Sequence, residues 1–185
     1  MKEKAITRTI LFFVLLFLVS LFKRWFFSFD LSTLYSFVLP FIYGAIVGYL
    51  LPYLDHLIYV YGICPNELTS QRVKAYFSKG NFLSGIKLLF LTHNERNKFI
   101  LHTAHFQLIL VMVAFWVVSS GGSIVGKGIV VFFLFSLVIQ QLLELYEKRN
   151  INDWFCAMPF DLSKAQQVLY VGANLVLVFL LALFL

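Results

Sequence analysis

Hydrophobic positions in this chain form long runs that short charged segments separate. A helix needs about 20 predominantly apolar residues to cross a bilayer. The pattern predicts such helices over about 5–25, 31–56, 99–118, 128–146 and 165–185. The chain is therefore expected to have an all-α fold, a polytopic integral membrane bundle of about five transmembrane helices in one domain, 1–185.

The first run follows a short basic tail, which is also how a cleaved signal peptide begins. After the run come Lys23, Arg24 and Trp25, where a signal peptide would carry small residues at its cleavage site. We therefore favour an uncleaved first helix.

The second run carries two features that bear on packing. Pro40 lies inside it, and membrane helices tolerate such a proline as a kink. Gly44 and Gly48 form a small-xxx-small pattern that lets another helix approach closely, although glycine is also simply common in membrane helices. Apolar residues continue to Gly62, so the helix is expected to extend that far before Pro65 ends it.

The longest polar connection, 64–98, contains two amphipathic pieces. They cover Ser70–Lys79 and Phe82–Thr92, with Gly80 between them and Asn81 as the candidate N-cap of the second. Basic amphipathic helices of this kind usually lie in the plane of the lipid headgroups. The segment therefore predicts an interfacial helical hairpin, with a solvated and merely structural hairpin as the alternative.

Composition supports the membrane assignment. Apolar residues make up 61% of the chain and charged residues 13%, whereas a soluble domain has about 45–50% and about 25%. The net charge of +6 is spread between the apolar runs, so the basic residues are interpreted as topology determinants and no nucleic-acid partner is expected.

Twelve of the fifteen Lys and Arg residues fall on one side of the predicted five-helix topology. The positive-inside rule places that side in the cytoplasm. We therefore predict a protein integral to the cytoplasmic (plasma) membrane, with the N-terminus cytoplasmic and the C-terminus outside. The predicted partners are the bilayer and anionic lipid headgroups, which would meet the basic segment 70–98.

Two elements close the chain. Residues 150–160 contain Trp154 and Phe155 and are interpreted as an interfacial loop. Asp161 is the expected N-cap of the last helix.

Several polar residues fall on the predicted cytoplasmic side at membrane depth. Ionisable residues there usually face the bundle interior and mark function. His102 and His105 are three apart near the start of the third helix and are expected to share a face. The set comprises Asp55 and His56 at the end of the second helix, His102 and His105, and a stripe of Ser136, Gln140 and Glu144 in the fourth helix.

Metal-assisted hydrolysis is the chemistry that such groups support. Histidine and carboxylate side chains hold zinc-like ions, and the metal lowers the pKa of a bound water. Asp55 beside His56 adds weight because a carboxylate orients an imidazole ligand. The histidines are equally compatible with interfacial side chains that hydrogen-bond neighbouring carbonyls.

Residues 48–56 resemble the G-x-L-x-P-D-x-D-H signature of the membrane-bound metal-dependent hydrolases, a family of small helical membrane proteins. The family's second motif, H-R-G-x-T-H-S, is matched in part at 101–103, and 135–140 falls where its H-x-x-x-D pair is expected. The chain departs from the pattern at Tyr53, Ser136 and Gln140. The first two departures remove an acid and a histidine, and the third removes an aspartate.

The resemblance implies a divalent, zinc-like metal bound by Asp55, His56 and His102, with His105 or Glu144 as supplementary ligand or catalytic base. The departures leave open whether any metal is bound. Three functions follow: a metal-dependent hydrolase acting on a membrane-proximal substrate at the cytoplasmic face, a non-catalytic membrane scaffold or binding protein, and, less favoured, a small transporter.

Overall fold

The computed structural model describes residues 34–92, 100–147, 150–156 and 162–184. Throughout these ranges the regular structure is helical and no strand occurs, which confirms the all-α class. The predicted first helix at 5–25 lies outside the described residues.

The second predicted helix is one long helical run made of five segments. They are η1 (Leu34–Val38), α3 (Leu39–Leu50), η2 (Leu51–Tyr53), α4 (Leu54–Ile58) and η3 (Tyr59–Ile63). The run passes the predicted end at residue 56 and stops before Pro65, as the continuing apolar residues indicated. The 3-10 turn η2 contains Pro52, and Asp55 is the second residue of α4, which follows this turn.

The polar connection folds as the predicted hairpin of α5 (Leu68–Ser78) and α6 (Phe82–Leu91). Gly80 has a φ of 73°, which glycine adopts without steric cost, and it reverses the chain between the helices. Asn81 caps α6 by accepting a hydrogen bond from the Ser84 amide at 3.4 Å. Local sequence signals thus define this element correctly.

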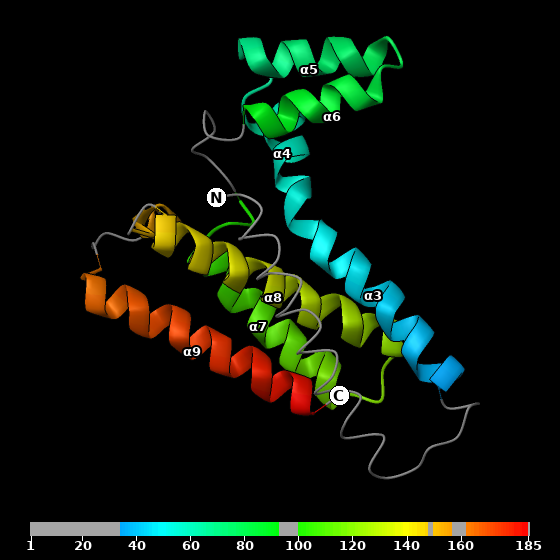
Figure 1. The fold of residues 1–185 in the computed structure, drawn as a ribbon, viewed down its shortest axis with the longest axis vertical. Helices are drawn as coiled ribbons and strands as arrows, with labels where there is room; N and C mark the ends of the chain where they lie inside the picture. The colour runs from blue at the N-terminus through cyan, green and yellow to red at the C-terminus, as the bar shows by residue number, and fades with distance from the viewer. Residues whose placement is uncertain (1–33, 93–99, 148–149, 157–161, 185) are drawn as a thin grey trace.

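The hairpin stands at the end of the long helical run, apart from the other helices (Figure 1). It has a small apolar core of its own, in which Val60 of η3 packs with Val73 of α5 and Leu89 of α6. The hairpin is therefore an arm that η3 and α4 connect to the bundle.

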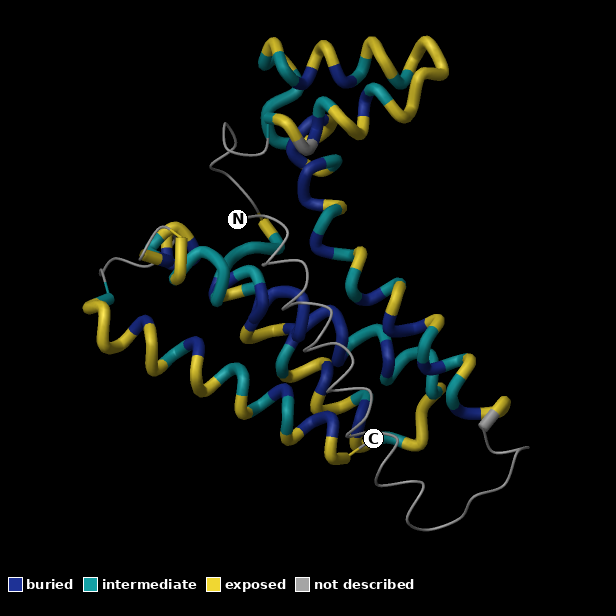
Figure 2. Tube along the Cα trace, in the orientation of Figure 1, coloured by how far each residue is buried: buried dark blue, intermediate teal, exposed yellow. Residues whose placement is uncertain are grey.

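The bundle is built around α8 (Ile124–Glu147), which begins earlier than the predicted residue 128. Helices α3, α7 (Ala104–Ser119) and α9 (Lys164–Leu183) all pack against it. Every residue of 131–139 is buried, so this part of α8 is enclosed on all sides (Figure 2). A helix that is apolar on every face suits this central place.

Glycines set the crossing of α3 and α8. A Cβ atom at Gly44 would collide with the carbonyl oxygen of Val125, and one at Gly48 with that of Ile129. Gly128 of α8 faces the backbone of α3 in the same way. The small-xxx-small pattern is therefore confirmed as a site of close helix approach.

Three described helical runs are long and apolar enough to cross a membrane, namely Tyr35–Ile63, Ile124–Glu147 and Lys164–Leu183. Helix α7 is apolar but has only 16 residues. Large apolar side chains also cover its outer face, among them Leu108, Met112, Phe115 and Trp116. Such a surface is compatible with lipid and not with water, so the chain is a membrane protein.

Two expectations concern the C-terminal part of the chain. Trp154 and Phe155 of η5 (Asn152–Phe155) are buried within the fold, and the interfacial position of their loop stays a prediction. The N-cap of α9 is Ser163, which forms a reciprocal capping box with Gln166, so the expectation of Asp161 as the cap is wrong; Asp161 itself lies outside the described residues. The sequence shows the S-x-x-Q spacing of this box, with the serine directly before the first residue of the last helix.

Candidate functional site

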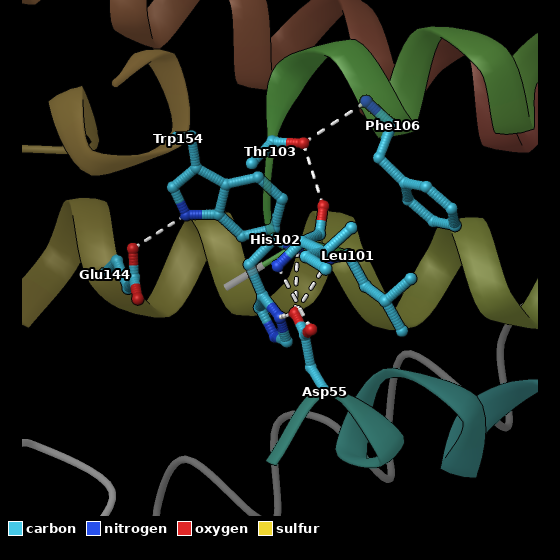
Figure 3. Close-up of polar contacts among 8 residues, drawn as sticks. Asp55, Leu101, His102, Thr103, Phe106, Glu144 and Trp154 are labelled. Atoms are coloured by element: carbon cyan, nitrogen blue, oxygen red, sulfur yellow. Dashed lines mark hydrogen bonds and ion pairs between the residues drawn. The ribbon is translucent and has the colours of Figure 1, made fainter. Parts of the chain in front are cut away.

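Asp55 is the most completely enclosed ionisable residue of the predicted site, with 0% of its surface exposed. Its Oδ1 accepts a hydrogen bond from the amide of Ile100 at 3.1 Å. Its Oδ2 accepts from the amides of Leu101 at 2.8 Å and His102 at 3.2 Å, and from His102 Nδ1 at 2.8 Å (Figure 3). We call this arrangement of Asp55 with residues 100–102 the Asp55 junction.

The Asp55 junction explains how a carboxylate is accommodated at membrane depth. A carboxylate has about four acceptor positions, and here four N–H groups point at it. Three of them are successive backbone amides, which form the kind of concave nest that binds anions. The nest lies just before α7, whose N-terminal dipole also favours negative charge.

Thr103 fixes the loop that presents these amides. Its Oγ1 donates to the Ile100 carbonyl at 2.9 Å and accepts from the Phe106 amide at 3.3 Å (Figure 3). Thr103 is thus the N-cap of α7, and it holds the nest in register with the helix.

Ser136 has a structural partner on the long helical run. Ser136 Oγ donates to the Tyr49 carbonyl at 3.2 Å. The serine therefore joins α8 to the long helical run, at a position where the family resemblance would have a metal-binding histidine.

His102 connects the Asp55 junction to helix α8. An ionised carboxylate only accepts hydrogen bonds, so Nδ1 of His102 is the donor to Asp55. The imidazole lies edge-on to the Trp154 ring, with the ring centroids 5.5 Å apart. Trp154 Nε1 donates to Glu144 Oε2 at 2.8 Å, which completes a line of side chains from α4 to α8 (Figure 3).

The structure brings some predicted site residues together and separates others. Asp55 and His102 are in contact, and Glu144 lies beyond Trp154 in the same line. His56 is buried on α4. His105 is exposed on α7, whereas His102 precedes the first residue of that helix, so the two histidines do not share a helical face as expected.

The residues present do not fit a metal ion that Asp55 ligates directly. Both Asp55 oxygens are occupied by hydrogen bonds within the chain. In the described ranges no three His, Cys, Asp or Glu side chains form a group that could hold a metal ion. The zinc-like cofactor and the catalytic roles of His105 and Glu144 therefore stay predictions.

A second polar group lies inside the bundle. Gln107 of α7 and Gln141 of α8 are buried and exchange amide hydrogen bonds of 2.6 and 3.5 Å. The Tyr170 hydroxyl of α9 donates to Gln107 Oε1 at 2.7 Å. Inside a membrane bundle such bonds join helices, so this group fixes α7, α8 and α9 relative to one another.

Gln167 holds the loop that carries Trp154. Its Oε1 accepts from the Ile151 amide at 3.2 Å, and its Nε2 donates to Asn152 Oδ1 at 2.7 Å and to the Leu162 carbonyl at 3.0 Å. The side chain is almost fully buried. Neither Trp154 nor Gln167 had been expected at the site, because both depend on how the loop folds back over the helix ends.

Comparisons with protein-family models, with curated proteins and with solved structures find no match for this chain.

Proposed function

We propose that this chain is a non-catalytic integral membrane protein that binds anionic lipid headgroups through the α5–α6 hairpin. The observation that carries this proposal is the composition of the hairpin surface. Arg72, Lys79 and Lys87 are exposed, Lys74 is half-buried, and Glu67 is the one acid of the described segment 64–92. Each basic residue near an anionic membrane surface contributes about 1 kcal/mol of attraction.

The Asp55 junction supports the non-catalytic assignment. A catalytic or metal-binding carboxylate needs an oxygen that is open to substrate or metal. Asp55 is fully enclosed and its four bonds tie the end of the long helical run to the start of α7. Its observed contacts are those of a structural anchor.

The positive-inside rule supports a cytoplasmic hairpin and a cytoplasmic N-terminus, and we propose the plasma membrane as the location. The cytoplasmic leaflet carries the anionic lipids, so the proposed orientation and the proposed ligand agree.

Amide hydrogen exchange of the full chain in lipid nanodiscs tests the proposal. Peptides from 68–92 should exchange more slowly in discs that contain phosphatidylserine than in discs of phosphatidylcholine alone, and high salt should remove the difference. The pair Lys79→Gln and Lys87→Gln should lose this lipid dependence. The matched control pair, Lys127→Gln and Lys164→Gln, removes two cations outside the hairpin and should keep it. Equal exchange in both lipids would contradict the proposal.

A metal-dependent hydrolase is the second candidate. The observation in its favour is the Asp55–His102 bond, because a carboxylate that accepts from one ring nitrogen orients the other toward a metal or substrate. Elemental analysis of the detergent-purified protein separates the candidates. Stoichiometric zinc that is lost in His102→Ala would favour the hydrolase, and protein without metal would eliminate it.

A further inference from the structure

The two helices of the hairpin differ in what they expose. On α6 the outward side chains are mainly large and apolar, and Lys87 is the one cation among them. The exposed apolar residues of α6 are Phe82, Leu83, Ile86 and Leu91. Leu83 is 84% exposed and Leu91 73%. Several large apolar side chains exposed on one short helix indicate a contact with lipid or with another protein.

Helix α5 has a different outward face. It exposes the polar or charged side chains of Gln71, Arg72 and Ser78, and Lys79 follows at its C-cap. Leu68 and Tyr76 are its exposed large apolar residues. The hairpin therefore has a basic, polar helix and an apolar helix, joined by the shared contacts of Val73 and Leu89.

The position of the two helices matches this difference. Helix α6 lies on the side of α4 and the bundle, whereas α5 is the outermost element (Figure 1). The long helical run that leads to the hairpin is itself a candidate membrane span that ends at Ile63. The hairpin therefore begins at the end of this candidate span, with its apolar helix on the side of the bundle.

We infer that α6 is embedded at the boundary between headgroups and acyl chains, while α5 covers it on the aqueous side. The occupant of the exposed α6 face is the acyl-chain region of the same bilayer that holds the bundle. Lys87 reaches the phosphates along its aliphatic stem, as lysine does at membrane interfaces. Arg72 and Lys79 of α5 remain at headgroup level, where anionic lipid attracts them.

This inference rests on the proposed function, which locates the hairpin at a lipid surface. It adds the depth of α6 in the bilayer and the orientation of the hairpin. Headgroup binding alone needs only the cations and leaves Leu83 in water. Embedding of α6 instead places Leu83 and Leu91 in contact with acyl chains.

Site-directed spin labelling of the full chain in liposomes tests the inference. The background carries Cys64→Ser and Cys156→Ser, and one nitroxide is placed at Leu83→Cys on α6 or at Ala75→Cys on the exposed face of α5. Oxygen concentrates in acyl chains, and a water-soluble nickel chelate does not. The Leu83 label should collide several-fold more with oxygen than with the chelate, and the Ala75 label should show the reverse. A second pair, Leu91→Cys and Gln71→Cys, guards against a local effect of one label.

The outcomes separate this inference from the proposed function. A Leu83 label that meets mainly the nickel chelate would overturn embedding, even if phosphatidylserine still slows amide exchange in the hairpin. A Leu83 label shielded from both reagents would also overturn it, because protein would then cover α6. If the Leu83 label collides with oxygen equally with and without phosphatidylserine, the embedding of α6 is supported. That result counts only against the proposal that the hairpin binds anionic lipid.

Discussion

The carboxylate of Asp55 and the imidazole of His102 meet at 2.8 Å, although 47 positions separate them in the sequence. The same carboxylate accepts from three successive backbone amides, so the pair is one part of a completely satisfied buried charge. This relationship joins the end of one apolar helical run to the start of another. Residues predicted to bind metal are thus part of the architecture that holds the helices together.

Replacement of Asp55 by alanine tests the anchoring role. Asp55→Ala leaves three backbone donors and the His102 ring without their acceptor, and each buried unsatisfied group costs about 1–3 kcal/mol. We expect the free energy of unfolding to fall by about 3 kcal/mol or more, as measured by titrating the micelle-bound protein with SDS and following helix content by circular dichroism. His105→Ala, at an exposed position of α7, is the control and should change stability by less than about 0.5 kcal/mol. Similar midpoints for both variants would argue against the Asp55 junction as an anchor.

The α3–α8 crossing predicts a strong difference between two glycines. Gly48→Ala places a methyl group against the Ile129 carbonyl oxygen, which the backbone avoids only by moving apart. We expect a loss of about 1–3 kcal/mol, the usual cost of overpacking. Gly172→Ala in α9 meets nothing within 4 Å and should be neutral or stabilise by up to about 1 kcal/mol through helix propensity. The same SDS titration measures both, and a neutral Gly48→Ala would show that the helices do not cross closely.

The bond between Trp154 and Glu144 is suited to a double-mutant cycle. Trp154→Phe keeps an aromatic ring against His102 and removes the N–H, and Glu144→Ala removes the acceptor. A hydrogen bond to a charged group contributes about 1.5–3 kcal/mol. We expect the double variant to lose clearly less stability than the two single losses together. Strict additivity would mean that the two side chains act independently.

The glutamine pair inside the bundle gives a similar prediction with a smaller magnitude. Gln107→Leu or Gln141→Leu alone leaves one buried amide without its partner, whereas the double variant removes both polar groups. Interhelical hydrogen bonds in membrane proteins couple by about 0.6 kcal/mol on average and up to about 1.7 kcal/mol. The double variant should therefore lose less stability than the sum of the losses in the two single variants. Thermal unfolding in detergent measures the three losses. Coupling of zero would assign the packing of α7 against α8 to apolar contacts alone.

Local signals were sufficient for the hairpin. Asn81 and Gly80 define the turn between α5 and α6, and the amphipathic pattern predicts both helices. These features depend on residues a few positions apart, so they are visible in the sequence. The exposed α6 face was also present in the pattern, but its position on the side of the bundle required the structure.

The loop before α9 shows where local signals failed. The sequence predicts Trp154 in an interfacial loop and does not show that its ring is buried between His102 and Glu144. The local sequence of an aromatic residue in a polar loop is the same whether its ring is exposed at a membrane interface or buried in the fold. The difference depends on Gln167, which folds the loop over the helix ends.

The sequence by itself determined that this is an all-α membrane protein, because bilayer thickness imposes long apolar helices that periodicity and length reveal. It also located the polar residues Asp55, His102 and Ser136. Only the tertiary structure decided what those residues do: Asp55 occupies a nest of amides, and Ser136 donates to the Tyr49 carbonyl of the neighbouring helix. The physical reason is that a polar side chain inside a membrane must find a partner, and that partner is set by helix packing between residues as far as 87 positions apart.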